Sequence, residues 1–237
     1  MVIKMDEKRI REILEKAYEE GRKALFEYEA KEIARLIGIP TPKNMFIKDL
    51  ESIEIDMLDL KEPYVIKIVS PQVIHKSDVG GVVLNVTKDN LKERITKMVE
   101  NVRTKIPNVF IEGVLIEEMA EKGVETIVGL VKDPQFGPVV MFGLGGIFVE
   151  IYRDVSFRLA PLDKDEALSM IREVKAYKIL RGYRGIPPSD IEAIADVIVK
   201  VGEFGYKFQE VSELDINPLM VYPNGVTALD VRIILGD

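Results

Sequence analysis

The feature that most constrains the fold of this 237-residue sequence is its alternation of short apolar runs with single amphipathic helices. Short apolar runs are typical of β-strands, whereas apolar residues at every third or fourth position are typical of helices. A helix with an apolar face from Leu91 to Val102 separates the second strand from the third. Strand pairs interrupted by single helices, twice over, predict an α+β fold with two lobes. The strands predicted in this part of the chain are Tyr64–Val69, Val82–Val86, Val114–Glu118, Thr126–Val131 and Val139–Phe142.

Helix signals flank this region on both sides. One apolar stripe follows a predicted N-cap at Asp6, and a second begins at Phe26 and stops at Gly38. A later helix follows Asp163, and another opens on a predicted capping box of Ser189 and Glu192. The tail predicts strands at Glu210–Ile216, Met220–Tyr222 and Val226–Val231. We expect the lobes to meet near residue 117, so that the first lobe, with the N-terminal helices, covers residues 1–116 and the second covers 117–237.

Composition excludes several classes of function. Cysteine is absent and His75 is the single histidine, which excludes disulfides, thiolate catalysis and multi-histidine metal sites. The formal net charge of −7 argues against nucleic acid as a partner, because no basic field would attract phosphates. No apolar run is long enough for a membrane span, and the charged N-terminus is unlike a signal peptide. We therefore expect no membrane partner and a cytoplasmic location. Abundant Lys and Glu without Cys and Trp are typical of a thermophile.

A lysine and a histidine stand close together in the first lobe. Lys67 lies inside an apolar strand, where burial is costly unless an anion meets it; alternatively it lies on a solvent-facing side of that strand. The loop that follows carries His75 and Lys76, and it ends with Gly80 and Gly81. A lone histidine is commonly structural, but one beside a lysine and a glycine pair, just after a strand lysine, is a candidate for chemistry.

The tail contains a second candidate site. Asp215 and Asn217 are two residues apart on a predicted strand and so share a face. A hairpin would return Asp230 beside Asn217. Oxygen donors of this kind suit Mg²⁺, which leaves positions for substrate phosphates. The alternative is a pair of turn residues, because Asn before Pro commonly starts a turn.

Two further segments have both structural and functional interpretations. Gly143 to Gly146 lacks the spacing of a dinucleotide-binding loop, and it forms either a tight turn or a close approach to phosphate. Glu117 and Glu118, with Glu125 beyond, are either solvated charges at a strand end or a connector that holds an adenine and its ribose.

The order of these elements is more specific than any one of them, and it resembles the ATP-grasp fold, in which two α+β lobes hold a nucleotide between them. Within that fold the chain resembles the β subunit of archaeal ADP-forming acetyl-CoA synthetase, a relative of succinyl-CoA synthetase. The likeness runs from about Ala30 to Asp237. It rests on the segments IVSPQVIHKSDVGGV, EKGVETIVGLVKDPQFGPVVMFGLGGIFVE, FRLAPL and LDINPL.

The resemblance implies a set of nucleotide-binding residues. Lys67 would contact phosphate, with Gly80 and Gly81 counted in the same set. Glu117, Glu118 and Met119 would form the adenine hinge, and Glu125 would hold the ribose. ATP or ADP would be the substrate, with Mg²⁺ as cofactor.

The resemblance also implies catalytic and metal-binding roles. His75 would become a second phosphohistidine that carries phosphate to ADP, and Asp215 would lie close to the incoming phosphohistidine of a partner. Asn217 and Asp230 would ligate Mg²⁺. The partner would be the CoA-binding α subunit in an α2β2 assembly, because this sequence shows no CoA-binding signature of its own. The segment Arg181–Gly185 resembles a family stretch to which no role is assigned.

Two other functions remain open from the sequence. One is an ATP-grasp ligase that forms an acyl phosphate directly from ATP, although such a ligase needs no histidine carrier. The other is a non-catalytic nucleotide-binding module that regulates another protein. A non-catalytic module would have lost its catalytic activity, and the presence of Lys67 and both metal-ligand candidates argues against such a loss.

Overall fold

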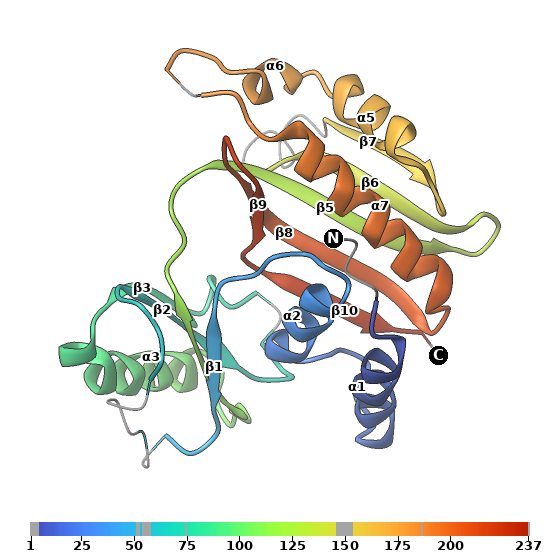
Figure 1. Ribbon diagram of the computed structural model, residues 1–237. Helices are drawn as coiled ribbons and strands as arrows, with labels where there is room; N and C mark the ends of the chain where they lie inside the picture. The colour runs from blue at the N-terminus through green and yellow to red at the C-terminus, as the bar shows by residue number, and fades with distance from the viewer. Residues whose placement is uncertain are drawn as a thin grey trace. The chain divides into compact units, whose positions relative to one another are not determined.

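The computed structural model describes residues 5–50, 53, 58–73, 75–145, 154–185 and 187–236. The chain divides into two compact units, and most of their helices and strands are labelled in Figure 1. The smaller unit comprises residues 42–121, and the larger unit comprises residues 1–41 together with 122–237.

The smaller unit is built on a four-stranded antiparallel sheet with the strand order β1-β4-β2-β3. The helix α3 packs against β2 and β3, because its apolar face meets alternate residues of the sheet. Tyr64, Ile66 and Ile68 of β2 point into this core, so the residues between them point to the opposite face. The bounds are β1 Asn44–Ile47, β2 Tyr64–Val69, β3 Val82–Val86, the short 3-10 helix η2 Lys88–Asn90, α3 Leu91–Lys105 and β4 Gly113–Glu118.

The larger unit is built on a second antiparallel sheet with the order β10-β8-β5-β6-β7, and β9 pairs with β8. The bounds of its strands are β5 Val124–Asp133, β6 Gly137–Leu144, β7 Val155–Leu159, β8 Val211–Val221, β9 Val226–Ala228 and β10 Val231–Leu235. Its helices are α1 Glu7–Glu19, α2 Glu27–Leu36, α5 Lys164–Glu173, α6 Tyr177–Leu180 and α7 Ile191–Lys207.

The helices of the larger unit share one core with one face of the sheet. In Figure 1, α7 lies across β5 and β6, and α2 packs against β10. Val128, Leu130, Leu214 and Ile216 contribute to this core from the sheet. Because neighbouring residues of a strand point to opposite faces, Gly129, Asp215 and the other residues between these positions point away from the helices.

The first two helices belong to the larger unit, whereas we expected them to accompany the first lobe. Their apolar faces explain this grouping, because Ile10 and Ile33 lie in the same buried cluster as Ile233 and Leu235 of β10. A backbone hydrogen bond of 3.0 Å from the Leu25 N–H to the Ile233 carbonyl joins the connection between the helices to the same strand.

The helix predictions hold, with one correction at a helix cap. Asp6 accepts from the Arg9 N–H at 3.2 Å, as predicted. The predicted capping box of Ser189 and Glu192 is wrong: Asp190 is the N-cap, and its carboxylate accepts from the N–H groups of Ala193 at 3.0 Å and Gly225 at 2.8 Å. An Asp side chain that reaches two separate backbone donors is the better cap.

The predicted strands form, and the structure adds β1 and β7, which we did not predict from the sequence. The tail differs more, since β8 runs without a break through Asn217 and Pro218. Ile216 lies opposite Val128 and Leu219 lies opposite Thr126, so two residues of β8 face the single Ile127 of β5. This β-bulge keeps Asn217 out of the core, and the Asn217 side chain is exposed to solvent. No helix among the described residues is long and apolar enough to cross a membrane.

Candidate functional site

A buried ion pair lies on the face of the smaller sheet that points away from α3. Lys67 on β2 is 6% exposed and Glu117 on β4 is 2% exposed, and their Nζ and Oε2 atoms are 3.1 Å apart. The register pairs Val65 with Glu117 and Lys67 with Leu115, which places the two charged residues diagonally on one face. Lys67 is therefore a buried cation, and Glu117 is an anion that makes its burial possible.

The loop between β2 and β3 presents His75 to solvent. The loop closes through a 2.7 Å hydrogen bond from the Gly81 N–H to the Lys76 carbonyl, and Lys105 of α3 donates to the Asp78 carbonyl at 2.9 Å. Within the part of the chain described, the His75 imidazole forms no hydrogen bond and no ion pair. An accessible imidazole on an anchored loop is suited to chemistry rather than to core packing.

The two glycines of this loop are required for different structural reasons. Gly80 has a φ of 73°, in the left-handed region that other residues adopt at a cost. Gly81 is buried, and a Cβ atom there would come within 2.6 Å of Cγ2 of Ile68. Both glycines therefore shape the turn that follows His75.

The end of β4 carries the predicted adenine hinge. The Glu118 N–H donates to the Lys43 carbonyl and the Met119 N–H donates to the Pro63 carbonyl, each at 2.9 Å. The Glu118 carboxylate accepts from the Lys61 N–H at 3.0 Å. These two N–H groups are engaged within the unit, so a base bound here would have to use other atoms of the hinge.

The remaining predicted residues lie in the larger unit. Glu125 is exposed near the start of β5, and its carbonyl accepts from the Gly145 N–H at 2.8 Å. Gly146, the last residue of the predicted glycine-rich segment, lies outside the described residues.

The structure brings Asn217 and Asp230 together. The Asn217 N–H donates to the Asp230 carbonyl at 3.1 Å, as expected for a hairpin that returns to β8. The strand predicted over Val226–Val231 is interrupted at Asp230, which lies just before β10. The β8 bulge and this interruption leave both residues outside the regular ladder of strand pairs.

These two side chains fit a hard cation. Among the described residues no group of three or more His, Cys, Asp or Glu side chains could hold a metal by itself. One amide oxygen and one carboxylate nevertheless suit Mg²⁺, which keeps several waters and completes its shell with substrate phosphates. The chemistry of the donors is therefore compatible with a metal held jointly with a nucleotide.

Asp215 lies on the open face of β8, opposite Arg232 of β10 and Gly129 of β5. Burial raises the pKa of its carboxyl group; the Arg232 charge opposes this increase, whereas the carboxylates of Glu213 and Asp230 add to it. Arg232 forms its ion pair with Glu213 rather than with Asp215.

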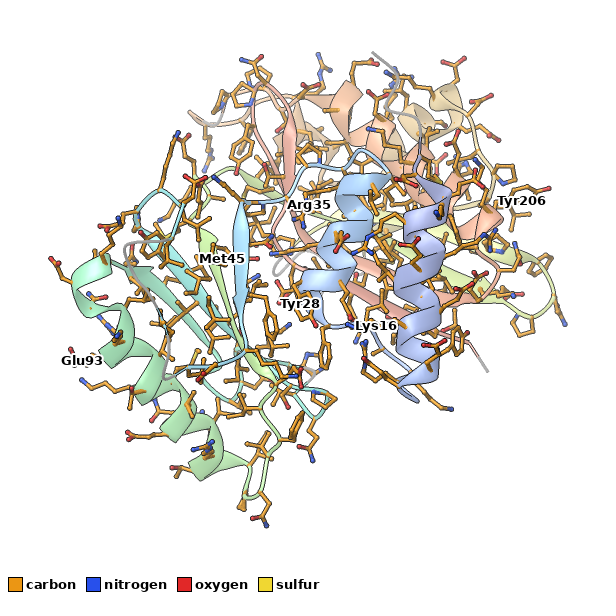
Figure 2. The ribbon with its side chains drawn as sticks, turned by 60° about the horizontal axis from the view of Figure 1, so that its bottom comes forward. Lys16, Tyr28, Arg35, Met45, Glu93 and Tyr206 are labelled. Carbon is orange, nitrogen blue, oxygen red and sulfur yellow. The ribbon has the colours of Figure 1, made fainter. Side chains whose placement is uncertain are left out.

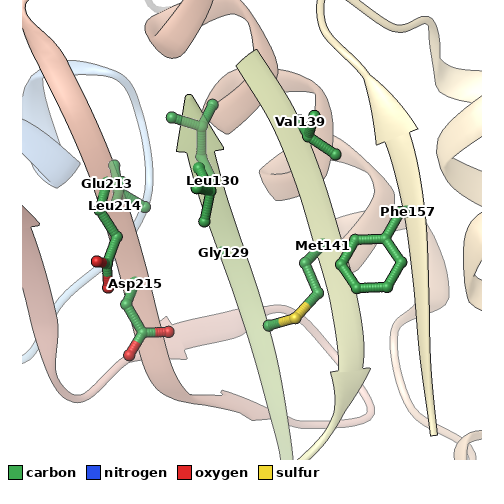
Figure 3. Close-up of a pocket in the computed structure, with 9 residues that line it drawn as sticks. Gly129, Leu130, Val139, Met141, Phe157, Glu213, Leu214 and Asp215 are labelled. Atoms are coloured by element: carbon green, nitrogen blue, oxygen red, sulfur yellow. The ribbon is translucent and has the colours of Figure 1, made fainter. Parts of the chain in front are cut away.

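Beside Asp215 the open face is hollowed, a feature that sequence patterns did not reveal. Asp215, Gly129, Met141 and Phe157 line a small hollow, as Figure 3 shows. Its volume is about 130 Å³. The other residues that line it are Leu130, Val131, Val139, Glu213 and Leu214. Its walls come from four strands whose register depends on long-range pairing, so no local signal in the sequence identifies it.

Comparison with known proteins places the chain in a family. A family model described as an ATP-grasp domain matches residues 16–235. The chain is 51% identical over 95% of its length to the β subunit of acetate–CoA ligase [ADP-forming] I of Pyrococcus furiosus, and the match covers 97% of that protein. It is 41% identical to acetate–CoA ligase [ADP-forming] I of Archaeoglobus fulgidus, of which the match covers 34%.

A solved structure with the same fold is acetyl-coenzyme A synthetase 1 of Ca. Korarchaeum cryptofilum, in complex with coenzyme A, Ca-AMPCP and HgCl⁺. That chain is 50% identical, with a TM-score of 0.92 over 95% of this chain and 99% of its own. Another structure of that protein, at 46% identity and a TM-score of 0.83 over 96% of this chain and all of its own, holds Mg-AMPPCP. Its phosphohistidine segment is described as pointing towards the nucleotide-binding site. The chain belongs to the ATP-grasp family, in its branch of ADP-forming acetate–CoA ligase β subunits.

Proposed function

We propose that this chain is the nucleotide-binding β subunit of an ADP-forming acyl-CoA ligase, which makes ATP from ADP and phosphate at the expense of acetyl-CoA or another acyl-CoA. The observation that carries this proposal is His75, an exposed histidine on an anchored loop, in a chain that matches such a β subunit over nearly its whole length. An ATP-grasp ligase that forms an acyl phosphate directly from ATP has no use for this histidine.

We assign a role in nucleotide binding to each of the residues predicted from the sequence. Lys67 would bind phosphate, Glu117 to Met119 would hold the adenine and Glu125 would hold the ribose. Asn217 and Asp230 would hold Mg²⁺ together with the nucleotide phosphates, and the metal would offset phosphate charge when bound. The burial of Lys67 and the pairing of Asn217 with Asp230 support these assignments.

The reaction sequence is a chain of phosphoryl transfers. Acyl-CoA and phosphate give an acyl phosphate and free CoA, and a histidine of the partner subunit takes the phosphoryl group as the carboxylate leaves. His75 then attacks this phosphorus, so that its N–P bond forms while the N–P bond of the partner breaks. Finally a β-phosphate oxygen of ADP displaces His75 and gives ATP. Covalent carriers divide one difficult transfer into easier ones, and the protein supplies position and charge neutralisation.

The partner in this scheme is the CoA-binding α subunit, in an α2β2 assembly. The single-chain relative, of which this chain matches about a third, supports a partner region within the same enzyme. Asp215 would lie close to the phosphohistidine that this partner delivers. A cytoplasmic location agrees with soluble substrates of this kind.

The proposal is tested by mixing the chain with its α subunit and following ATP formation from ADP, phosphate and acetyl-CoA. We expect ATP only when both subunits are present. The absence of ATP formation with an α subunit that itself binds CoA would contradict the proposed function.

A further inference from the structure

The open face of the larger sheet carries one continuous row of side chains across five strands. In order these residues are Arg232, Asp215, Gly129, Met141 and Phe157, and each lies directly opposite the next in the strand register. Residues opposite each other on neighbouring strands point to the same face. The row therefore runs from charged groups on β10 and β8 to apolar groups on β6 and β7, with a glycine between them.

Gly129 is a glycine that the fold itself does not require. Its φ lies outside the left-handed region, and a Cβ there would meet Cε of Met141 at 3.4 Å, an ordinary contact. At Gly205 of α7, in contrast, a Cβ would come within 2.1 Å of Leu130 and would clash. A glycine inside a strand without a structural reason often marks a place where another group approaches closely. The missing side chain keeps the hollow open.

The hollow has the size and chemistry of a seat for one side chain. Its volume of about 130 Å³ is well below the roughly 300 Å³ at which sites for small-molecule ligands begin. One wall is apolar, and its rim includes Phe157, which is 54% exposed, and Val131, which is 55% exposed. The other wall carries Asp215, which accepts no hydrogen bond from the residues that the structure describes.

The Asp215 carboxylate is partly exposed, so it can accept a hydrogen bond from a donor outside the chain. The Nε–H of Arg232, at the charged end of the row, is buried and has no acceptor among the described residues. The row thus combines an apolar hollow with one buried Nε–H without an acceptor and one carboxylate that is accessible to a donor. This complementarity fits an apolar side chain that stands next to a hydrogen-bond donor.

We infer that the hollow seats an apolar side chain of the partner-subunit segment that delivers the phosphoryl group, with a donor of that segment bonded to Asp215. This inference rests on the proposed function, which requires that segment to approach Asp215. A bound apolar anchor would hold the incoming segment in register while its phosphoryl group is transferred, and positioning of this kind is what phosphoryl transfer demands.

The test uses the complex of both subunits and two variants of the hollow. Gly129→Ala places a methyl group inside the hollow at a normal contact distance from Met141, so the fold should remain intact. Phe157→Ser removes the exposed aromatic rim. The matched control is Tyr206→Ser, because Tyr206 on α7 is 55% exposed and lies on a helix outside this face (Figure 2).

Phosphoryl transfer from the phosphorylated partner subunit to ADP is measured in a single turnover at saturating partner. We expect both hollow variants to slow this transfer by roughly tenfold or more, as for loss of an interface anchor. Binding of ADP with Mg²⁺ to each isolated chain should be unchanged, and Tyr206→Ser should behave like the wild type.

Other results would overturn the inference. Normal phosphoryl transfer in both hollow variants would exclude binding of a partner side chain in the hollow. If the hollow variants assemble more weakly with the partner subunit but transfer the phosphoryl group normally at saturating partner, the face belongs to a permanent subunit interface. If the variants change the self-association of the isolated chain, the face binds a second copy of this chain. If the wild-type complex makes no ATP at all, the proposed function itself fails, and this result is distinct from the others.

Discussion

The ammonium group of Lys67 lies 3.1 Å from the carboxylate of Glu117, and both side chains are almost completely buried. Removing one member of a buried pair leaves the other charge in a medium of low polarity, which costs roughly 3–5 kcal/mol. The pair therefore links nucleotide binding to stability, since the same lysine is proposed to meet phosphate.

Replacing Lys67 should affect both properties. We expect Lys67→Met to lower the free energy of unfolding by about 3 kcal/mol or more. It should also weaken ADP binding by about 1.5–3 kcal/mol, the value of a lost charge-assisted contact. Urea unfolding and ADP titration measure the two effects. Lys97→Met is the control, because Lys97 is an exposed lysine paired with Glu93 on α3.

A double variant separates the two roles of the lysine. Lys67→Met combined with Glu117→Gln removes both charges, so part of the lost stability should return while ADP binding stays weak. Recovery of ADP binding in the double variant would mean that Lys67 serves only to neutralise Glu117.

Replacing Asp230 tests the proposed metal site. Asp230→Ala removes one of two oxygen donors, and we expect ADP affinity to lose its dependence on Mg²⁺ while the unfolding transition changes little. Calorimetric titration of ADP with and without Mg²⁺ provides the measurement. Asp165→Ala is the control, because Asp165 is an exposed carboxylate on α5. If the variant binds Mg-ADP as the wild type does, Asp230 is not a ligand.

The corrected helix cap gives a prediction about stability alone. Asp190→Ala removes acceptors from the N–H groups of Ala193 and Gly225, so it should lower the free energy of unfolding by about 1–2 kcal/mol. Ser189→Ala should change it by less than about 0.5 kcal/mol, as for a surface substitution without a special role. Denaturant midpoints of the two variants compare these effects directly, and an equal loss in both would restore Ser189 as a cap.

The sequence predicted those features that depend on local patterns. The helix from Glu7 to Glu19 follows from its apolar spacing and its cap at Asp6, and β2 follows from an unbroken apolar run. The strands β1 and β7 are short, at four and five residues, and both were missed. The sequence of β7, VSFRL, does alternate apolar and polar residues, so its period was a signal that we did not use. The two lobes were predicted, but the core that α1 and α2 share with β10 depends on contacts across almost the whole chain.

The same distinction holds for the candidate site. The pairing of Asn217 with Asp230 was predictable, because the two residues lie close together in the sequence on the two sides of a hairpin. The partnership of Lys67 with Glu117 and the hollow beside Asp215 depend on sheet register between distant segments. No periodicity in a single sequence contains that register.

The glycine at position 80 links the loop backbone to the chemistry of His75. An alanine at a φ of 73° adopts the left-handed region at a cost of about 1–2 kcal/mol, so Gly80→Ala should lower stability by that amount. Gly137→Ala is a matched control, because Gly137 has a φ of 78° and a Cβ atom at either glycine would meet nothing within 4 Å. Urea unfolding should show similar losses for both, whereas only Gly80→Ala should slow phosphorylation of His75. If His75 is phosphorylated at the same rate in both variants, the loop conformation at Gly80 does not affect the reaction.

The central prediction is that His75 becomes phosphorylated. It is the chain's single histidine, it is exposed, and an imidazole nitrogen can act as a nucleophile. Incubating the assembled enzyme with labelled ATP and Mg²⁺ should give an acid-labile, base-stable label on this chain. His75→Ala should remove the label and stop net ATP synthesis, while ADP binding should remain because Lys67 and Asp230 are intact. Normal turnover in His75→Ala would mean that the partner's histidine transfers its phosphoryl group to ADP directly.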